Sequence, residues 1–163
     1  MFVRDFIHVD QPFEVVAPRF VRGTTWLAPI AEEAAAIALD VADQLAGGPG
    51  SDAETGTEGS RPRLRAGPVR CHVGPVRARA GAGSILVPLW LINEQSDAGL
   101  PDLTGDLEVA PVGRSRCLIA LGATYPRTTW EQATLHRVER ATEAGVRSFL
   151  NGIAAALARP VGV

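Results

Sequence analysis

Three polar side chains lie where the sequence pattern is otherwise apolar, and they are the residues best placed to do chemistry. Tyr125, the only tyrosine, ends an apolar segment immediately before Pro126. Thr142 lies near the middle of the apolar sector of a helical segment at 135–157, and Glu139 lies just inside the edge of that sector. A phenol, a hydroxyl and a carboxylate at such positions could hydrogen-bond a ligand in a pocket, and the carboxylate could exchange a proton.

Each of these side chains also has a simpler explanation. The Thr142 hydroxyl can bond to the carbonyl of Val138, four residues back in the helix. Glu139 can extend beyond the sheet edge into water, which avoids the large cost of burying an unpaired carboxylate. Tyr125 can cap the core and keep its hydroxyl in water. Both explanations stay open for each residue.

The histidines and cysteines show no pattern typical of a metal or redox site. His8, His72 and His136 fall on alternating strand faces or on the flank of the terminal helical segment, so we expect them at the surface. Their scattered positions have no ligand-like spacing, and we expect neither a metal nor a cofactor. Cys71 and Cys117 each lie in an apolar alternating segment, which predicts two buried free thiols.

Common linear catalytic motifs are absent: the sequence has no GxSxG, no Walker loop, no Rossmann glycine pattern and no HExxH. An enzyme that mainly shapes a reactive chain in a pocket needs no such motif. Catalytic residues therefore stay unassigned, and binding without catalysis is the leading hypothesis.

Composition fits one globular domain over 1–163, because the chain has 163 residues, 46% of them hydrophobic, and a net charge of −2. Residues 61–79 carry six Arg and no acid. These arginines largely alternate with apolar residues and no aromatic lies among them, which argues against nucleic-acid binding.

No apolar stretch suits a membrane span or a signal peptide, so we expect a cytoplasmic protein without a membrane partner.

The elements that must position these side chains begin with a strand at 3–9, where polar and apolar residues alternate. A short helix follows from Pro12, and Pro18 is expected to bend or divide it. A longer helix begins near 25–29 and ends before a Gly-rich segment. Its expected apolar face consists of Ile30, Ala34, Ile37, Ala38, Val41 and Leu45.

The segment at 47–62 has no residue more apolar than Ala and predicts a flexible loop. After it, turn signals separate several short strands, which is typical of an antiparallel meander. The most hydrophobic strands, 85–92 and 117–125, should be central, covered on one face and carrying small residues on the other. The terminal helix must bury its apolar sector against this sheet. That sector contains Leu135, Val138, Val146, Phe149, Leu150, Ile153 and Leu157.

Two glycines in the terminal helix need a reason, because each costs about 1 kcal/mol of helix propensity relative to Ala. Gly145 and Gly152 lie seven residues apart on one side of the apolar sector. Close packing of another element would explain them, and so would extra room for a ligand.

In this order, the segments IHVDQPFEVV, VPLWL, LPDLTGDLEVAPVG and LHRVERATEAGVRSFLNGIAAAL resemble the START-like, birch-pollen-allergen-like superfamily, also called SRPBCC. The resemblance implies an α+β helix-grip fold. In that fold a curved antiparallel sheet wraps around a long C-terminal helix, and two helices follow the first strand. Members include lipid and hormone carriers, polyketide aromatase/cyclases and ring-hydroxylase subunits, so the fold does not determine the function.

The resemblance also implies a cavity between the sheet and the terminal helix. We expect it to bind a hydrophobic small molecule, lipid or polyketide-like, in a protein that is a monomer or homodimer. Alternatives are a polyketide aromatase/cyclase- or dehydratase-like enzyme, and a protein-interaction module that uses the arginine-rich strands or the acidic loop. Candidate cavity residues, any of which could equally be ordinary core, are Trp26, Leu27, Trp90, Leu118, Leu121, Tyr125, Glu139, Thr142, Val146, Phe149 and Ile153.

Overall fold

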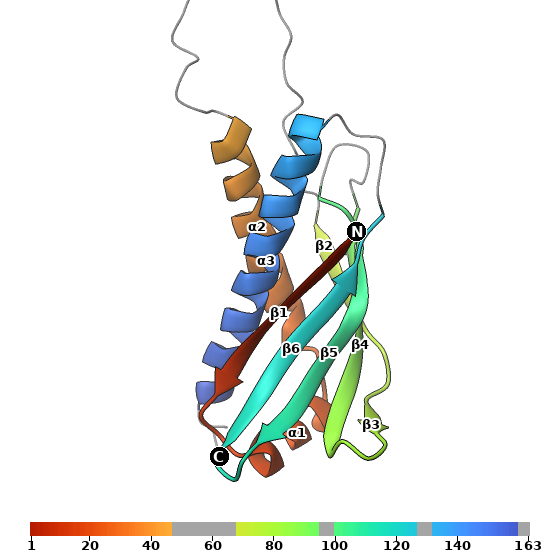
Figure 1. Cartoon of the computed structure of the whole chain (residues 1–163), viewed down its shortest axis with the longest axis vertical. Helices are drawn as coiled ribbons and strands as arrows, with labels where there is room; N and C mark the ends of the chain where they lie inside the picture. Colours follow the sequence, from red (N-terminus) through yellow and green to blue (C-terminus); the bar gives the residue numbers. More distant parts are fainter. Residues whose placement is uncertain (47–67, 95–99, 127–131, 160–163) are drawn as a thin grey trace, which may run out of the picture.

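The computed structural model describes residues 1–46, 68–94, 100–126 and 132–159 (Figure 1). The loop expected at 47–62 lies outside these residues. The elements within them are β1 (Phe2–Val9), α1 (Phe13–Arg22), α2 (Leu27–Ala46), β2 (Val69–Val73), β3 (Arg77–Arg79), β4 (Ser84–Asn93), β5 (Leu103–Val112), β6 (Arg116–Thr124) and α3 (Gln132–Ala158).

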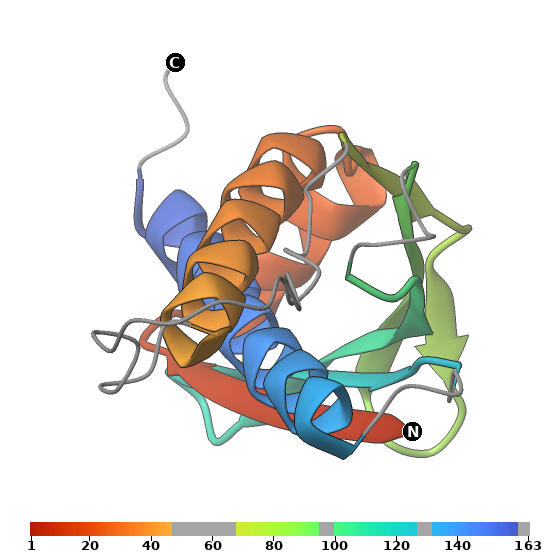
Figure 2. The ribbon, with the colours of Figure 1, turned by 90° about the horizontal axis from the view of Figure 1, so that it is seen from above.

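The strands form one antiparallel sheet in the order β1-β6-β5-β4-β2, and β3 also pairs with β4. The expected central position of the two most hydrophobic strands is confirmed, since β4 and β6 both have neighbours on each side. The backbone N–H of Tyr125 donates to the carbonyl of Met1 at 2.9 Å and extends the β1–β6 pairing. Figure 2 shows the sheet curving around the helices, which all lie on one of its faces.

The terminal helix α3 buries the predicted sector. Val138, Val146, Phe149, Leu150, Ile153 and Leu157 are each at most 2% exposed, and Leu135 is partly buried. α3 packs along β1, while α2 runs beside α3 over much of its length (Figure 2). This arrangement is the expected α+β helix-grip fold, with two helices after the first strand and a curved sheet around the last helix.

The two early helices differ in detail from the expectation. Of the two expected effects of Pro18, a bend or a division, the division is wrong, because α1 runs through Pro18 as a single helix. α2 is rotated relative to the predicted face, because Ile37 and Leu45 are 39% and 44% exposed. The buried positions are filled mainly by small residues: Leu27, Ala31, Ala34, Ala38, Leu39 and Ala42.

Close helix packing explains both the rotation of α2 and the two glycines of α3. A Cβ built on Gly145 would lie 3.1 Å from Cβ of Ala38, and one on Gly152 would overlap Cγ2 of Ile30. Because the two backbones approach so closely, α2 presents Ala38 to Gly145, and its larger Ile30 packs against α3 where Gly152 leaves room. Of the two explanations for the glycines, the structure favours close packing.

The sheet face turned away from the helices carries alternate residues of every strand. On β6 these are Leu118, Ala120 and Gly122, which agrees with the expectation of mainly small residues. On β4 the expectation is wrong, because Trp90 and Ile92 are large and 39% and 38% exposed. We refer to this face below as the outer face.

Candidate functional site

A small apolar pocket lies between the inner face of the sheet, α2 and α3, with a volume of about 50 Å³. Its α2 wall consists of Ala31, Ala34, Ala35 and Ala38. The sheet and the segment before β5 contribute Val69, Leu91, Asn93, Leu100, Pro101, Leu103 and Leu121, and α3 contributes Thr142, Gly145, Val146 and Phe149.

Thr142 is the polar residue that α3 places in this pocket. It is 5% exposed, and its buried Oγ1 has no hydrogen-bond partner among the residues that the structure describes. Of the two explanations open for Thr142, the bond to the carbonyl of Val138 is therefore not formed. A buried hydroxyl without a partner costs about 1–3 kcal/mol, so this position calls for an explanation beyond local helix structure.

Asn93, a residue that the sequence reasoning missed, shapes the rim of the pocket. Its side-chain amide donates to the carbonyl of Leu100 at 3.1 Å, and its backbone N–H donates to Oδ1 of Asp102 at 2.8 Å. These bonds tie the end of β4 to the segment before β5. The available signal was strand parity, because Asn93 alternates in phase with the buried residues Val87 and Leu89.

Four predicted cavity residues meet at this pocket: Leu121, Thr142, Val146 and Phe149. Leu27 and Ile153 are fully buried in the adjoining core and do not line it.

Trp26 lies elsewhere, at the start of α2. Its ring packs on Phe20 with centroids 5.1 Å apart, and its Nε1 donates to the carbonyl of Gly23 at 2.9 Å. These contacts explain the tryptophan as part of the junction between α1 and α2.

Trp90 and Leu118 lie on the outer face of the sheet, opposite the pocket. Leu91, the neighbour of Trp90, lines the pocket instead. Both strands are apolar on their two faces, so hydrophobicity alone does not indicate which parity points inward.

Tyr125 and Glu139 come together in a separate place, a wide groove of about 900 Å³ between β1 and α3. Tyr125 is 6% exposed, and burial, followed by the charges of Glu139 and Glu143, raises the pKa of its phenol. Its hydroxyl is therefore neutral near pH 7 and can donate a hydrogen bond. Since Thr142 lines the interior pocket, the structure divides the three polar candidates between two sites.

Ion pairs occupy much of the groove. Arg147 Nε lies 2.5 Å from Asp5 Oδ2, and Arg140 Nη1 lies 3.3 Å from Glu143 Oε2. The groove is thus open and of mixed charge, whereas the interior pocket is almost entirely apolar.

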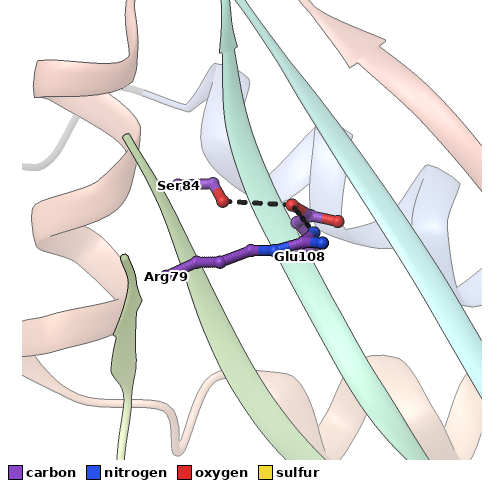
Figure 3. Close-up of polar contacts among 3 residues, drawn as sticks. All are labelled: Arg79, Ser84 and Glu108. Atoms are coloured by element: carbon purple, nitrogen blue, oxygen red, sulfur yellow. Dashed lines mark hydrogen bonds and ion pairs between the residues drawn. The ribbon is translucent and has the colours of Figure 1, made fainter. Parts of the chain in front are cut away.

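A polar cluster on the outer face joins three strands (Figure 3). Oε1 of Glu108 accepts hydrogen bonds from Arg79 Nη1 at 2.8 Å and from Ser84 Oγ at 3.0 Å. The carboxylate is paired with a cation and holds β3 against the sheet. We assign this cluster a structural role.

Arg137 is a second residue that the helical pattern did not single out. It lies outside the apolar sector of α3, yet it is only 8% exposed, and its Nε and Nη2 have no partner among the described residues. It lines none of the pockets discussed above.

The histidines and Cys117 occupy the expected environments, whereas Cys71 is less buried than expected. His8, His72 and His136 are exposed; Cys117 is buried, Cys71 is partly buried, and both thiols are free. Within the described ranges, no three His, Cys, Asp or Glu side chains group in a way that could hold a metal ion. No helix in that part of the chain is long and apolar enough to cross a membrane.

No protein-family model and no curated protein sequence matches the chain. Among solved structures it is similar to the Zhui aromatase/cyclase of a Streptomyces species, with 14% identity, a TM-score of 0.45, and coverage of 96% of this chain and 93% of that chain. It is also similar to norcoclaurine synthase of Thalictrum flavum, in complex with dopamine and hydroxybenzaldehyde. There the identity is 12%, the TM-score is 0.44, and the match covers 96% of this chain and 85% of that chain. A hypothetical protein of Helicobacter pylori is similar with 13% identity and a TM-score of 0.43, and the match covers 96% of this chain and 87% of that chain.

These values describe distant likenesses and assign no activity. The class follows from the element order, the sheet order and the position of α3: the chain is an α+β helix-grip protein. Its resemblance to the START-like superfamily is a resemblance of fold.

Proposed function

We propose that the protein binds a hydrophobic small molecule in the pocket between the sheet, α2 and α3. The observation that carries this proposal is the Thr142 hydroxyl, which is buried in a mainly apolar lining and has no hydrogen-bond partner within the described part of the chain. A ligand with one hydrogen-bonding group on an apolar body would satisfy that hydroxyl and bury its remaining surface against Val146 and Phe149.

The volume of the pocket bears on the size of the ligand. About 50 Å³ is room for a few water-sized groups, whereas pockets for drug-sized ligands measure roughly 300–1,000 Å³. A lipid or polyketide-like molecule therefore enters only if the lining moves. The alanine wall of α2 has no side chains that could rotate away, so the movement would have to come from larger side chains such as Leu91 and Phe149, or from the rim at 100–103 that Asn93 ties to β4.

The chemistry of the lining supports binding more than catalysis. The polar side chains facing the pocket are Asn93 and Thr142, and neither titrates in the ordinary pH range. Tyr125 and Glu139, the groups that an acid–base mechanism would use, line the other groove. A cyclase- or dehydratase-like reaction would have to proceed in this pocket without them.

Competition for an apolar fluorescent probe tests the proposal. We expect a medium-chain alcohol to displace the probe from the wild-type protein more strongly than the matching hydrocarbon. In Thr142→Val, which keeps the shape but lacks the hydroxyl, this preference should disappear while hydrocarbon binding persists. Thr104→Val, at an exposed position of the outer face, is the matched control and should behave as the wild type.

A blocking variant tests the location. Ala35→Leu adds bulk at a partly buried position of the pocket wall, so probe binding should fall while the circular dichroism spectrum is unchanged. Native mass spectrometry of the purified protein should show a small molecule that is absent from the same variant. A wild-type protein that binds neither probe nor copurified ligand would overturn the proposal, as would an Ala35→Leu variant that binds like the wild type.

A further inference from the structure

The outer face of the sheet is unusually apolar for a surface that none of the described helices covers. Figures 1 and 2 show every helix on the opposite face. Nine large hydrophobic residues are exposed in the described part of the chain, and five of them lie on this face. A concentration of exposed apolar side chains on one surface marks an interaction site more often than chance exposure does. The five are Phe2, Phe6, Trp90, Ile92 and Val112, exposed by 38–65%.

The strand register gives this face a ridge and a trough. β1, the edge strand, forms the ridge with Phe2, Arg4 and Phe6. Its neighbour β6 forms a shallow trough, where Ala120 and Gly122 lie opposite Phe6 and Arg4. The Phe2 ring lies over Gly122, and Ala120 is only 5% exposed. Beyond the trough, Thr104, Asp106 and Glu108 of β5 lie level with the three ridge residues, followed on β4 by Trp90, Pro88 and Leu86.

We propose that this face docks a second copy of the chain, sheet against sheet, about a two-fold axis that runs parallel to β6. Such an axis places the β1 ridge of each copy over β5 of the other and brings the two β6 troughs together. The small residues of β6 allow the sheets to approach near the axis. The contact is isologous and closes as a dimer.

Charge complementarity supports this axis over others. Arg4 and Asp106 occupy the same row of the sheet, on either side of Gly122. Neither forms an ion pair within the residues that the structure describes. About the proposed axis Arg4 lies opposite the partner's Asp106, and the symmetry forms this pair twice.

The apolar residues are complementary in the same arrangement. Phe2 comes to lie over the row that ends in the partner's Trp90, and Phe6 over the row that ends in the partner's Leu86. The partner's Glu108 lies in the second of these rows, opposite Phe6, and is the charged group that this apolar side chain would meet. Figure 3 shows its carboxylate turned toward Ser84 and Arg79; Ser84 donates a hydrogen bond to it, and the Arg79 guanidinium neutralises its charge within one copy.

The size of the face predicts a weak dimer. Four strands of about eight residues cover about 19 Å by 26 Å, or about 500 Å² per copy. The total of about 1,000 Å² is at the lower limit for specific interfaces. We therefore expect a dissociation constant in the micromolar range and a dimer that appears as the protein concentration rises.

Sedimentation velocity of the full chain over a wide concentration range tests the proposal. The wild type should shift from monomer to dimer, and Phe6→Ser should raise the dissociation constant at least about tenfold by removing an exposed apolar anchor. Arg4→Asp and Asp106→Arg should each weaken the dimer by placing like charges opposite each other. The double variant Arg4→Asp/Asp106→Arg should restore it.

Val21→Ser is the matched control, because Val21 is 64% exposed on α1, away from this face, and it should leave the dimer unchanged. Circular dichroism establishes that each variant is folded. A wild type that stays monomeric at every concentration overturns the proposal, as does a dimer that is insensitive to Phe6→Ser. A dimer weakened by both single charge variants but not restored in the double variant overturns the proposed axis. Probe binding in the interior pocket is measured separately, so either proposal can fail alone.

Discussion

Ala38 of α2 and Gly145 of α3 face each other so closely that a Cβ on Gly145 would lie 3.1 Å from Cβ of Ala38. Both residues also line the interior pocket. The close approach of the two helices therefore sets one wall of the pocket and keeps its volume small. Two helical turns further along α3, Gly152 makes the corresponding contact with Ile30.

Gly152→Ala should destabilise the protein, although it replaces a poor helix former by the best one. The new Cβ would overlap Cγ2 of Ile30, and overpacking of this kind costs about 1–3 kcal/mol. The gain in helix propensity is about 1 kcal/mol, so we expect a net loss of about 1 kcal/mol in the free energy of unfolding, measured by urea denaturation.

Two further variants separate packing from propensity. Asn151→Ala changes an exposed residue one position earlier and should be neutral or slightly stabilising. Ile30→Ala removes the atoms that the new methyl would meet, so Gly152→Ala should cost less in that background than in the wild type. Additive effects of the two substitutions would contradict the contact.

Arg19 of α1 anchors the end of α3. Its Nη1 donates to the carbonyls of Leu157 at 3.1 Å and Arg159 at 3.2 Å, and Gln11 Nε2 donates to the same Leu157 carbonyl at 2.9 Å. A cation bonded to the last carbonyls of a helix is favourable by about 1–2 kcal/mol. Arg19→Gln should lower the free energy of unfolding by about that amount.

Arg22→Gln is the control for this loss, because Arg22 lies in the last turn of the same helix and is exposed. It should change stability by less than about 0.5 kcal/mol. An equal effect of the two substitutions would show that the charge of α1, and not the contact with α3, is responsible.

Much of the fold could be predicted from sequence patterns. The period of 3.6 residues in 135–157 identified the buried sector of α3, and the alternation in 3–9 identified β1, because each element buries one face. The chain order of these elements led to the helix-grip fold. The predicted apolar face of α2 was wrong because hydrophobicity favours Ile37 and Leu45, whereas the positions buried in the structure are filled mainly by alanines.

The site was less predictable, for two reasons that particular residues illustrate. Trp90 and Leu91 are adjacent and both apolar, and which of them faces the pocket depends on a strand parity that no polar residue marks. Tyr125 and Glu139 depend on how α3 sits against β1, a tertiary relation that helical periodicity does not contain. Thr142 and Phe149 were predictable because their place on α3 depends on the helix alone.

Thr142→Val should leave the protein as stable as the wild type, or stabilise it by up to about 1 kcal/mol, in the absence of ligand. The substitution replaces a buried hydroxyl that has no partner in the described residues by a methyl group of similar shape. Thr142→Ala, which removes the packing methyl as well, should instead destabilise. Thermal denaturation measures both, and a loss of more than about 1 kcal/mol in Thr142→Val would reveal a hydrogen bond to the hydroxyl.

Cys71 should be an unreactive thiol near neutral pH. Burial raises the pKa of Cys71 from 9.0 to about 11, so at pH 8 its thiolate fraction is about 100-fold lower than that of an unperturbed cysteine. The folded protein holds this proton more tightly than the unfolded chain. The contribution of Cys71 to stability is therefore complete below pH 9.0 and is lost as the pH rises toward 11.

Alkylation by iodoacetamide in a Cys117→Ala background isolates Cys71. The rate for the native protein should rise steadily from pH 8 and level off only near pH 11, whereas the urea-unfolded protein should level off about two pH units lower. Cys71→Ala should show a smaller loss of stability between pH 9 and 11 than its parent, because it lacks the group whose proton is released. A native rate at pH 8 equal to that of the unfolded chain would contradict the shifted pKa and place the thiol in water.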